Sequence, residues 1–240
     1  MSTAILSMTY FGPVQWYQKM HRYDSILLEC HDSFIKQTYR NRCVIPTANG
    51  VQALTVPVGR VVRDEGLGKS EEGRGIRDER LGLSEEMDAS LTPHPSSLTL
   101  HPSSLIHVSD HGNWRHLHWN ALVSAYGDSP FFEYYADDLR PFFERKWEFL
   151  YDFDMAITMK MCELLDIHPR ITLTDHYVKE EELAAIDDFR DAIRPKHPLP
   201  DPSFEPREYY QVYSSRNGFC PNMSILDLLF NMGNEAIFYL

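Results

Sequence analysis

The sequence lacks the short motifs that identify the commonest enzyme classes. It contains no GxSxG, GxGxxG or Walker A pattern, so it offers no hydrolase nucleophile elbow, dinucleotide fingerprint or P-loop. It also has no HExxH and no paired Cys/His spacing, which are the usual marks of a zinc site. We therefore assign no metal site, and the sequence identifies no cofactor.

Cysteine is scarce, and long apolar runs are missing. The 4 cysteines are scattered and form no CxxC pair, which predicts reduced thiols rather than a disulfide framework. No stretch of about 20 apolar residues could span a bilayer, and the first residues lack the basic and apolar regions of a signal peptide. We therefore expect a cytoplasmic protein with no transmembrane segment.

Positive charge is also in short supply. The formal net charge is −12 over 240 residues, whereas proteins that bind nucleic acid depend on Lys and Arg to neutralise phosphates. We expect no nucleic-acid partner. A small anionic substrate remains possible, because it needs only a local basic pocket.

Residues 63–107 contain no Phe, Trp or Tyr, and they repeat themselves. The run that begins at Arg63-Asp64-Glu65 recurs from Arg77, and His94-Pro95-Ser96-Ser97-Leu98 recurs from His101. A repetitive segment without aromatics cannot build much core. We predict one domain over 1–240, interrupted at 63–107 by a disordered, low-complexity insertion in a surface loop.

Strand and helix signals alternate in the rest of the chain. A first strand at 4–10, a helix at 14–23 after Gly12-Pro13, and a short apolar strand at 26–28 form a βαβ pattern. Asn49-Gly50 predicts a hairpin between 40–46 and 51–58. Further helices are expected at 114–126, 131–143 and 146–165, with strands at 171–173 and 209–213. The predicted class is α/β: a small, partly parallel sheet with an added antiparallel hairpin, flanked by helices.

A basic run at 36–42 is the first candidate binding site. If this run is extended, Lys36, Arg40 and Arg42 share one face, while Tyr39 and Asn41 lie on the other. Arginine suits bidentate recognition of phosphate or carboxylate. The alternative is an edge strand whose charges prevent aggregation.

Two candidate proton-transfer groups lie in helices. His118 falls on a largely aromatic stripe of the helix at 114–126, as a core histidine or as a general acid/base. Asp227 lies between Ser224 and Asn231 on one stripe of an otherwise apolar helix that ends at Gly233. A buried carboxylate must be paired or shift its pKa, so this stripe either stabilises the fold or faces a pocket. Tyr210 and Gln211 add polar tips that could contact a sugar.

Several of these segments resemble the WbqC-like protein family, especially its Bacteroidetes-type members. The matching pieces are Ala4-Ile5-Leu6 leading to Pro13, the run 36–42, Leu54-Thr55-Val56-Pro57-Val58, the segment from Trp114 to Tyr126, the segment from Tyr209 to Phe219, and 224–233. The family has a short link where this chain has 63–107. The resemblance implies a place in O-antigen or other surface-polysaccharide gene clusters and a transferase role, including a proposed glycine transfer onto a sugar. It brings no established catalytic residues.

Together these features predict a cytoplasmic transferase acting on an activated sugar or transferring an aminoacyl group to a sugar. In this hypothesis Lys36, Arg40 and Arg42 hold an anionic or sugar-linked substrate. Tyr39, Asn41, Tyr210 and Gln211 orient it, and Asp227 or His118 is the base. The alternative is a non-enzymatic binding or assembly protein of the same pathway. The enzyme hypothesis requires Lys36, Arg40, Arg42, His118, Tyr210 and Asp227 to line one pocket, and their scattering would favour the alternative.

Overall fold

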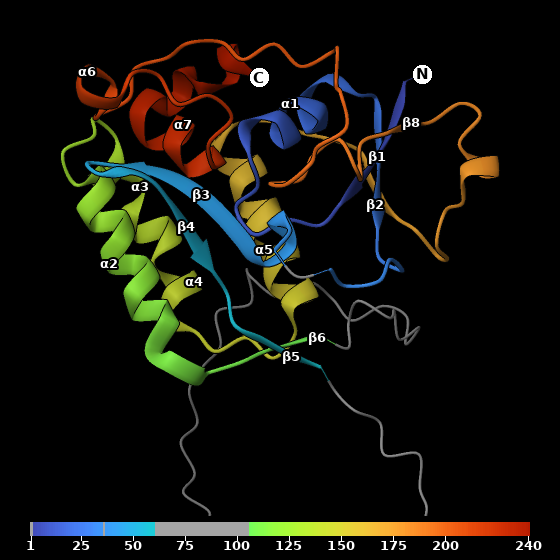
Figure 1. Ribbon diagram of the computed structural model, residues 1–240, viewed down its shortest axis with the longest axis horizontal. Helices are drawn as coiled ribbons and strands as arrows, with labels where there is room; N and C mark the ends of the chain where they lie inside the picture. Colours follow the sequence, from blue (N-terminus) through green and yellow to red (C-terminus); the bar gives the residue numbers. More distant parts are fainter. Residues whose placement is uncertain (1, 36, 61–105) are drawn as a thin grey trace, which may run out of the picture.

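A four-stranded parallel sheet lies at the centre of the fold (Figure 1). The computed structural model describes residues 2–35, 37–60 and 106–240. The sheet order is β7-β2-β1-β8, and all three pairings are parallel. Its strands are β1 (Thr3–Ser7), β2 (Ser25–Glu29), β7 (Ile171–Leu173) and β8 (Asp187–Asp188). The predicted α/β class is confirmed.

The predicted βαβ unit forms the first part of the sheet. Helix α1 (Val14–Arg22) follows Pro13 and connects β1 to β2, which pair from Thr3–Ser25 to Ser7–Glu29. Strand β1 ends at Ser7, three residues before the predicted end at Tyr10. The next residues turn away from the sheet: Tyr10 donates its backbone N–H to Tyr39, and Phe11 has φ of 42°. Because the chain turns away here, residues from other segments can pack against the carboxyl end of β1.

Two antiparallel strand pairs form two further small sheets, separate from the parallel one. The predicted hairpin is present as β3 (Arg42–Thr47) and β4 (Gly50–Thr55), joined through Ala48 and Asn49. Gly50 has φ of 104°, which only glycine adopts easily. The second pair is β5 (Val58–Arg60) with β6 (Ile106–Val108), in which Arg60 lies opposite Ile106. The predicted insertion falls mostly outside the described residues, and β6 includes its last two positions.

The helices follow the predicted periodicity with two differences. Helix α2 (Trp114–Tyr126) has its predicted bounds. The segment at 131–143 is two helices, α3 (Phe132–Leu139) and α4 (Pro141–Glu144), because Pro141 lacks the N–H that would continue the first one. Helix α5 (Leu150–Leu164) starts four residues later than predicted. The remaining elements are α6 (Ser214–Asn217), α7 (Ile225–Met232), and 3-10 turns at Tyr39–Asn41, His111–Asn113, Glu180–Glu182 and Gly233–Tyr239.

The prediction of a strand at 209–213 is wrong. This segment forms no regular strand, and it lies against α7 through side-chain hydrogen bonds instead of a backbone ladder. Its aromatic side chains supplied the strand signal, but aromatic residues also pack well without a sheet.

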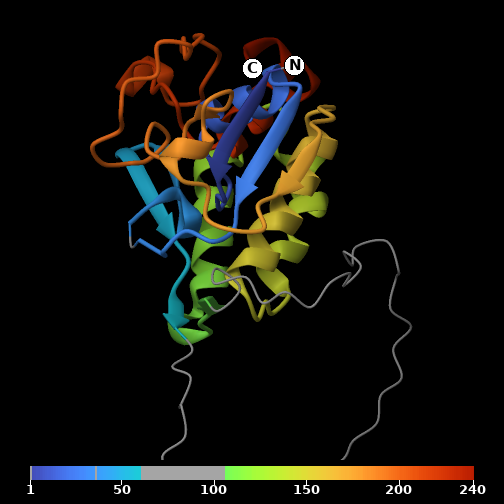
Figure 2. The same ribbon diagram turned by 90° about the vertical axis from the view of Figure 1, so that its right-hand side faces the viewer.

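Helices α1, α2 and α5 lie on one side of the parallel sheet, as Figures 1 and 2 both show. The core between these layers is strongly aromatic and includes Tyr10, Trp16, Phe153 and Phe230. Within the described residues, no helix is both long and apolar enough to cross a membrane. Because the strands are parallel, their carboxyl ends gather at one edge, where α/β sheets usually bind ligands.

Candidate functional site

A pocket of about 510 Å³ opens at this carboxyl edge, within the usual size range of small-molecule sites. Its walls come from the residues after β1, the residues after β2, the turn at 37–40 and the segment after β8. The polar side chains that line it are Ser7, Thr9, His31, Asp32, Ser33, Gln37, Thr38, Tyr39, Arg40, Tyr177, Asp188, Arg190, Asp191, Arg194 and Lys196. We call this cavity the edge pocket.

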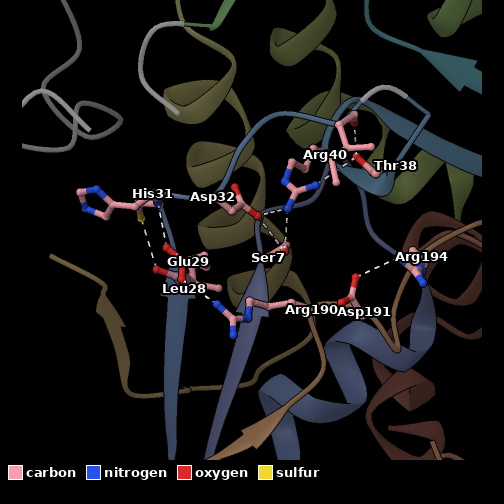
Figure 3. Close-up of polar contacts among 12 residues, drawn as sticks. Ser7, Leu28, Glu29, His31, Asp32, Thr38, Arg40, Arg190, Asp191 and Arg194 are labelled. Carbon is pink, nitrogen blue, oxygen red and sulfur yellow. Dashed lines mark hydrogen bonds and ion pairs between the residues drawn. The ribbon is translucent and has the colours of Figure 1, made fainter. Parts of the chain in front are cut away.

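Arg40 is anchored in one wall of the edge pocket by the ends of the first two strands (Figure 3). Its Nη2 forms an ion pair with Asp32 and donates a 3.0 Å hydrogen bond to the hydroxyl oxygen of Ser7. Ser7 in turn donates to Asp32 over 3.3 Å. Burial lowers the pKa of Arg40 to about 10, so its guanidinium stays charged at neutral pH.

Arg190 stands beside this cluster, on the segment after β8. Its Nη1 donates to Glu29 over 3.0 Å and to the Val178 carbonyl over 2.8 Å, and its Nη2 lies 2.7 Å from Asp188. Glu29 is 1% exposed and accepts three further hydrogen bonds, from the Thr174 hydroxyl and from the backbone N–H groups of His31 and Val178. Glu29 therefore holds Arg190 in place, and its two oxygens already accept hydrogen bonds from four donors.

Two further cations stand at the rim. Arg194 is paired with Asp191 at 2.9 Å, and Lys196 donates to the side-chain oxygen of Gln37 over 2.6 Å. The described lining therefore brings four cationic side chains together with three carboxylates, those of Asp32, Asp188 and Asp191. Guanidinium groups held in this way suit bidentate contact with a phosphate or carboxylate. The lining is chemically suited to a small anion with polar substituents.

Only part of the basic run at 36–42 reaches the edge pocket. Tyr39 and Arg40 line it, whereas Lys36 lies outside the described residues. The expectation of an extended run is wrong, because Tyr39–Asn41 forms a 3-10 turn. Asn41 turns inward, where its amide donates to the Val56 carbonyl over 2.9 Å. Arg42 lies on β3 and donates to the Thr55 hydroxyl on β4.

His118 does not line the edge pocket. It is 6% exposed and packs between Tyr10 and Trp114, and its Nδ1 lies 2.9 Å from the Tyr10 hydroxyl. Burial lowers its pKa to about 4, against the opposing effect of a backbone hydrogen bond with Thr55. The imidazole is therefore neutral at neutral pH and held within the core.

Asp227 also lies away from the edge pocket. Its Oδ2 accepts hydrogen bonds from the Tyr209 hydroxyl at 2.6 Å and from the Gln211 amide at 2.7 Å, and the Asn231 amide lies 3.2 Å from Oδ1. Burial raises the pKa of this carboxyl to about 6, although these donors oppose the shift. Neighbouring Tyr210 is 55% exposed. The structure thus separates these residues from Arg40.

Sequence reasoning missed most of the residues that line the edge pocket. Ser7 is the last residue of β1 and Asp32 follows the end of β2, so their positions at strand ends were the available signal. Arg190 and Arg194 gave no comparable signal. They follow a strand of only two residues, Asp187–Asp188, which no local pattern predicts.

A family model described as the WbqC-like protein family matches residues 9–68 and 101–194. The match includes Asp32, Arg40, Arg190 and Arg194 of the edge pocket and leaves out 69–100, inside the repeat region. It also leaves out the residues after 194, so α7 and the Tyr209 segment lie beyond it. No curated protein and no solved structure matches the chain.

Proposed function

Because this chain belongs to the WbqC-like protein family, we propose that it is a cytoplasmic transferase of surface-polysaccharide biosynthesis that binds an anionic, sugar-linked substrate in the edge pocket. The observation that carries the proposal is the convergence of Arg40, Arg190, Arg194 and Lys196 on one cavity of an acidic protein. The lining carries these four cations against three carboxylates, a formal surplus of one positive charge in a protein of net charge −12, and this local surplus favours an anionic ligand.

Arg40 is the residue best placed to contact the anion. Its Nη2 serves both Asp32 and Ser7, and its Nη1 lies 3.5 Å from the Thr38 hydroxyl. A guanidinium has five N–H donors. The contacts that Arg40 makes with the described residues do not use all five, so donors remain for a ligand. The pairing with Asp32 also fixes the side chain before a ligand arrives, which lowers the entropy lost on binding.

Calorimetric titration of glucose 1-phosphate and UDP-glucose tests the proposal. For whichever probe native protein binds, we expect Arg40→Gln to raise the dissociation constant about tenfold or more. The substitution removes a charge-assisted hydrogen bond. Arg42→Gln is the matched control, because Arg42 contacts Thr55 outside the edge pocket. Equal affinities for native protein and Arg40→Gln, or no binding of either probe by native protein, would refute the proposed site.

A second candidate function is a binding or assembly protein without turnover. The scatter of the predicted residues favours it: of Arg40, Arg42, His118, Tyr210 and Asp227, only Arg40 lines the edge pocket, and His118 and Asp227 are hydrogen-bonded in the core. Incubation with a nucleotide-sugar and a glycine donor distinguishes the two functions. Product that depends on Arg40 supports the transferase, whereas tight binding without product supports the binding protein.

A further inference from the structure

One buried carboxyl group near the edge pocket has no hydrogen-bond partner among the described residues. Asp154 lies on α5, is 1% exposed, and has an Oδ1 atom that no described donor reaches. Buried polar atoms are nearly always paired, because an unpaired one costs free energy. Such a group in a folded protein calls for an explanation, which can be an ordered water, a functional role or a ligand.

Asp154 borders a narrow crevice behind the edge pocket. The crevice has room for about 20 Å³, enough for a single water-sized group. Its apolar walls come mainly from Met8, Phe34, Ile106 and Leu150. It shares three lining residues with the edge pocket: Met8, Asp32 and Arg40. The Asp32–Arg40 ion pair thus lies where the crevice adjoins the edge pocket.

Of the four charged side chains that line the crevice among the described residues, Glu29, Asp32 and Arg40 are hydrogen-bonded or paired and Asp154 is not. Arg40 is paired with Asp32 rather than with Asp154, and Glu29 is saturated by its four donors. Burial raises the pKa of Asp154 well above its ordinary value, while Arg40 acts in the opposite direction. A protonated carboxyl can both donate and accept a hydrogen bond.

We infer that the crevice is an inner subsite of the edge pocket, in which the Asp154 carboxyl hydrogen-bonds one hydroxyl group of a ligand whose anionic group lies against Arg40. The inference rests on the proposed function and narrows its substrate class. The ligand must carry a hydroxyl group within a few bonds of its phosphate or carboxylate, as sugar phosphates do. Inorganic phosphate meets the requirement of Arg40 but not that of Asp154.

The test compares glucose 1-phosphate and inorganic phosphate by calorimetry on native protein, Asp154→Asn and Asp154→Leu. Asn keeps both hydrogen-bonding capacities, whereas Leu has a similar size and keeps neither. We expect Asp154→Leu to bind glucose 1-phosphate about tenfold more weakly and inorganic phosphate with unchanged affinity. Asp154→Asn should stay within about threefold of native protein for both probes.

A ligand-side experiment covers the case in which Asp154→Leu fails to fold. Singly deoxygenated analogues of glucose 1-phosphate are titrated into native protein, and one of them should bind about tenfold more weakly than the parent. Affinities unchanged by both the Leu substitution and every deoxygenation would refute the inner subsite, leaving a crevice that holds only water. In that case native protein still binds phosphate through Arg40. If the proposed function is wrong, native protein binds no phosphate at all, so the two failures give different results.

Discussion

The Tyr209 hydroxyl donates a 2.6 Å hydrogen bond to Oδ2 of Asp227, and both side chains are buried. Gln211 donates to the same oxygen and also bonds the backbone of Cys220, through both its amide nitrogen and its amide oxygen. The contact therefore ties an irregular segment to α7. Asp227 serves this connection and does not meet the basic turn that contains Arg40.

Burial of Asp227 makes the free energy of unfolding depend on pH. The pKa of Asp227 rises from 3.8 in the unfolded chain to about 6 in the folded protein, so the folded state favours the protonated form. Its contribution to stability is complete below about pH 4 and is lost as pH rises through 6, a change of about 3 kcal/mol. Urea unfolding of native protein and Asp227→Asn, measured from pH 4 to 7, tests this. The free energy of unfolding of native protein should fall relative to that of Asp227→Asn as pH rises.

The comparison cancels other titrating groups, His118 included, because both proteins contain them. A difference that stays constant from pH 4 to 7 would show that Asp227 has an ordinary pKa in the folded protein.

Gly233 ends α7 where no other residue fits. Its φ is 56°, and a Cβ atom there would lie 2.7 Å from the Phe131 ring. We expect Gly233→Ala to lower the free energy of unfolding by about 2–4 kcal/mol through backbone strain and overlap together. Gly218→Ala is the control, because Gly218 has φ of 72° but no atom within 4 Å of its added Cβ. Equal losses in chemical denaturation would mean that the Phe131 contact contributes nothing.

The Glu29–Arg190 pair should be important for stability. Removing one partner of a buried ion pair commonly costs about 3–5 kcal/mol, and Arg190 keeps Asp188 as a second partner. We therefore expect Glu29→Gln to cost about 3 kcal/mol, at the lower end of that range. The control is Glu181→Gln, because Glu181 is exposed. It should change the free energy of unfolding by less than about 0.5 kcal/mol. A loss below 1 kcal/mol in Glu29→Gln would contradict a structural role for the pair.

The repeat region should be dispensable. Strands β5 and β6 already place Arg60 opposite Ile106, so a short link can join the two ends of the segment. Deleting 69–100, the stretch that the family match leaves out, should keep the fold and raise stability by about 1 kcal/mol through a smaller loop-closure cost. A loss of more than about 2 kcal/mol on urea unfolding would show that this segment packs on the domain.

Local sequence patterns predicted much of the fold because they reflect local physics. The alternation around β1, α1 and β2 and the Asn49-Gly50 turn both correspond to elements of the structure. Failures occurred where one residue broke a pattern, as Pro141 divides a predicted helix, or where aromatic residues near Tyr209 pack without a ladder.

The candidate site was less predictable. Arg40 and Tyr39 could be identified from the basic run, but their neighbours in the edge pocket come from distant parts of the chain. Arg40 meets Ser7 across 33 positions of sequence, and Arg190 meets Glu29 across 161. Asp154 left a weaker signal, a carboxylate on a mostly apolar buried face of α5 that also carries Thr158.

The sequence by itself determined the α/β class, the βαβ unit and the hairpin, since backbone preference and hydrophobic period act over a few residues. Tertiary structure alone decided that Asp32, Arg40 and Arg190 share one cavity while His118 and Asp227 are held in the core. The reason is physical: which polar side chains meet depends on how the whole chain packs around a parallel sheet, and no local preference specifies contacts over such separations.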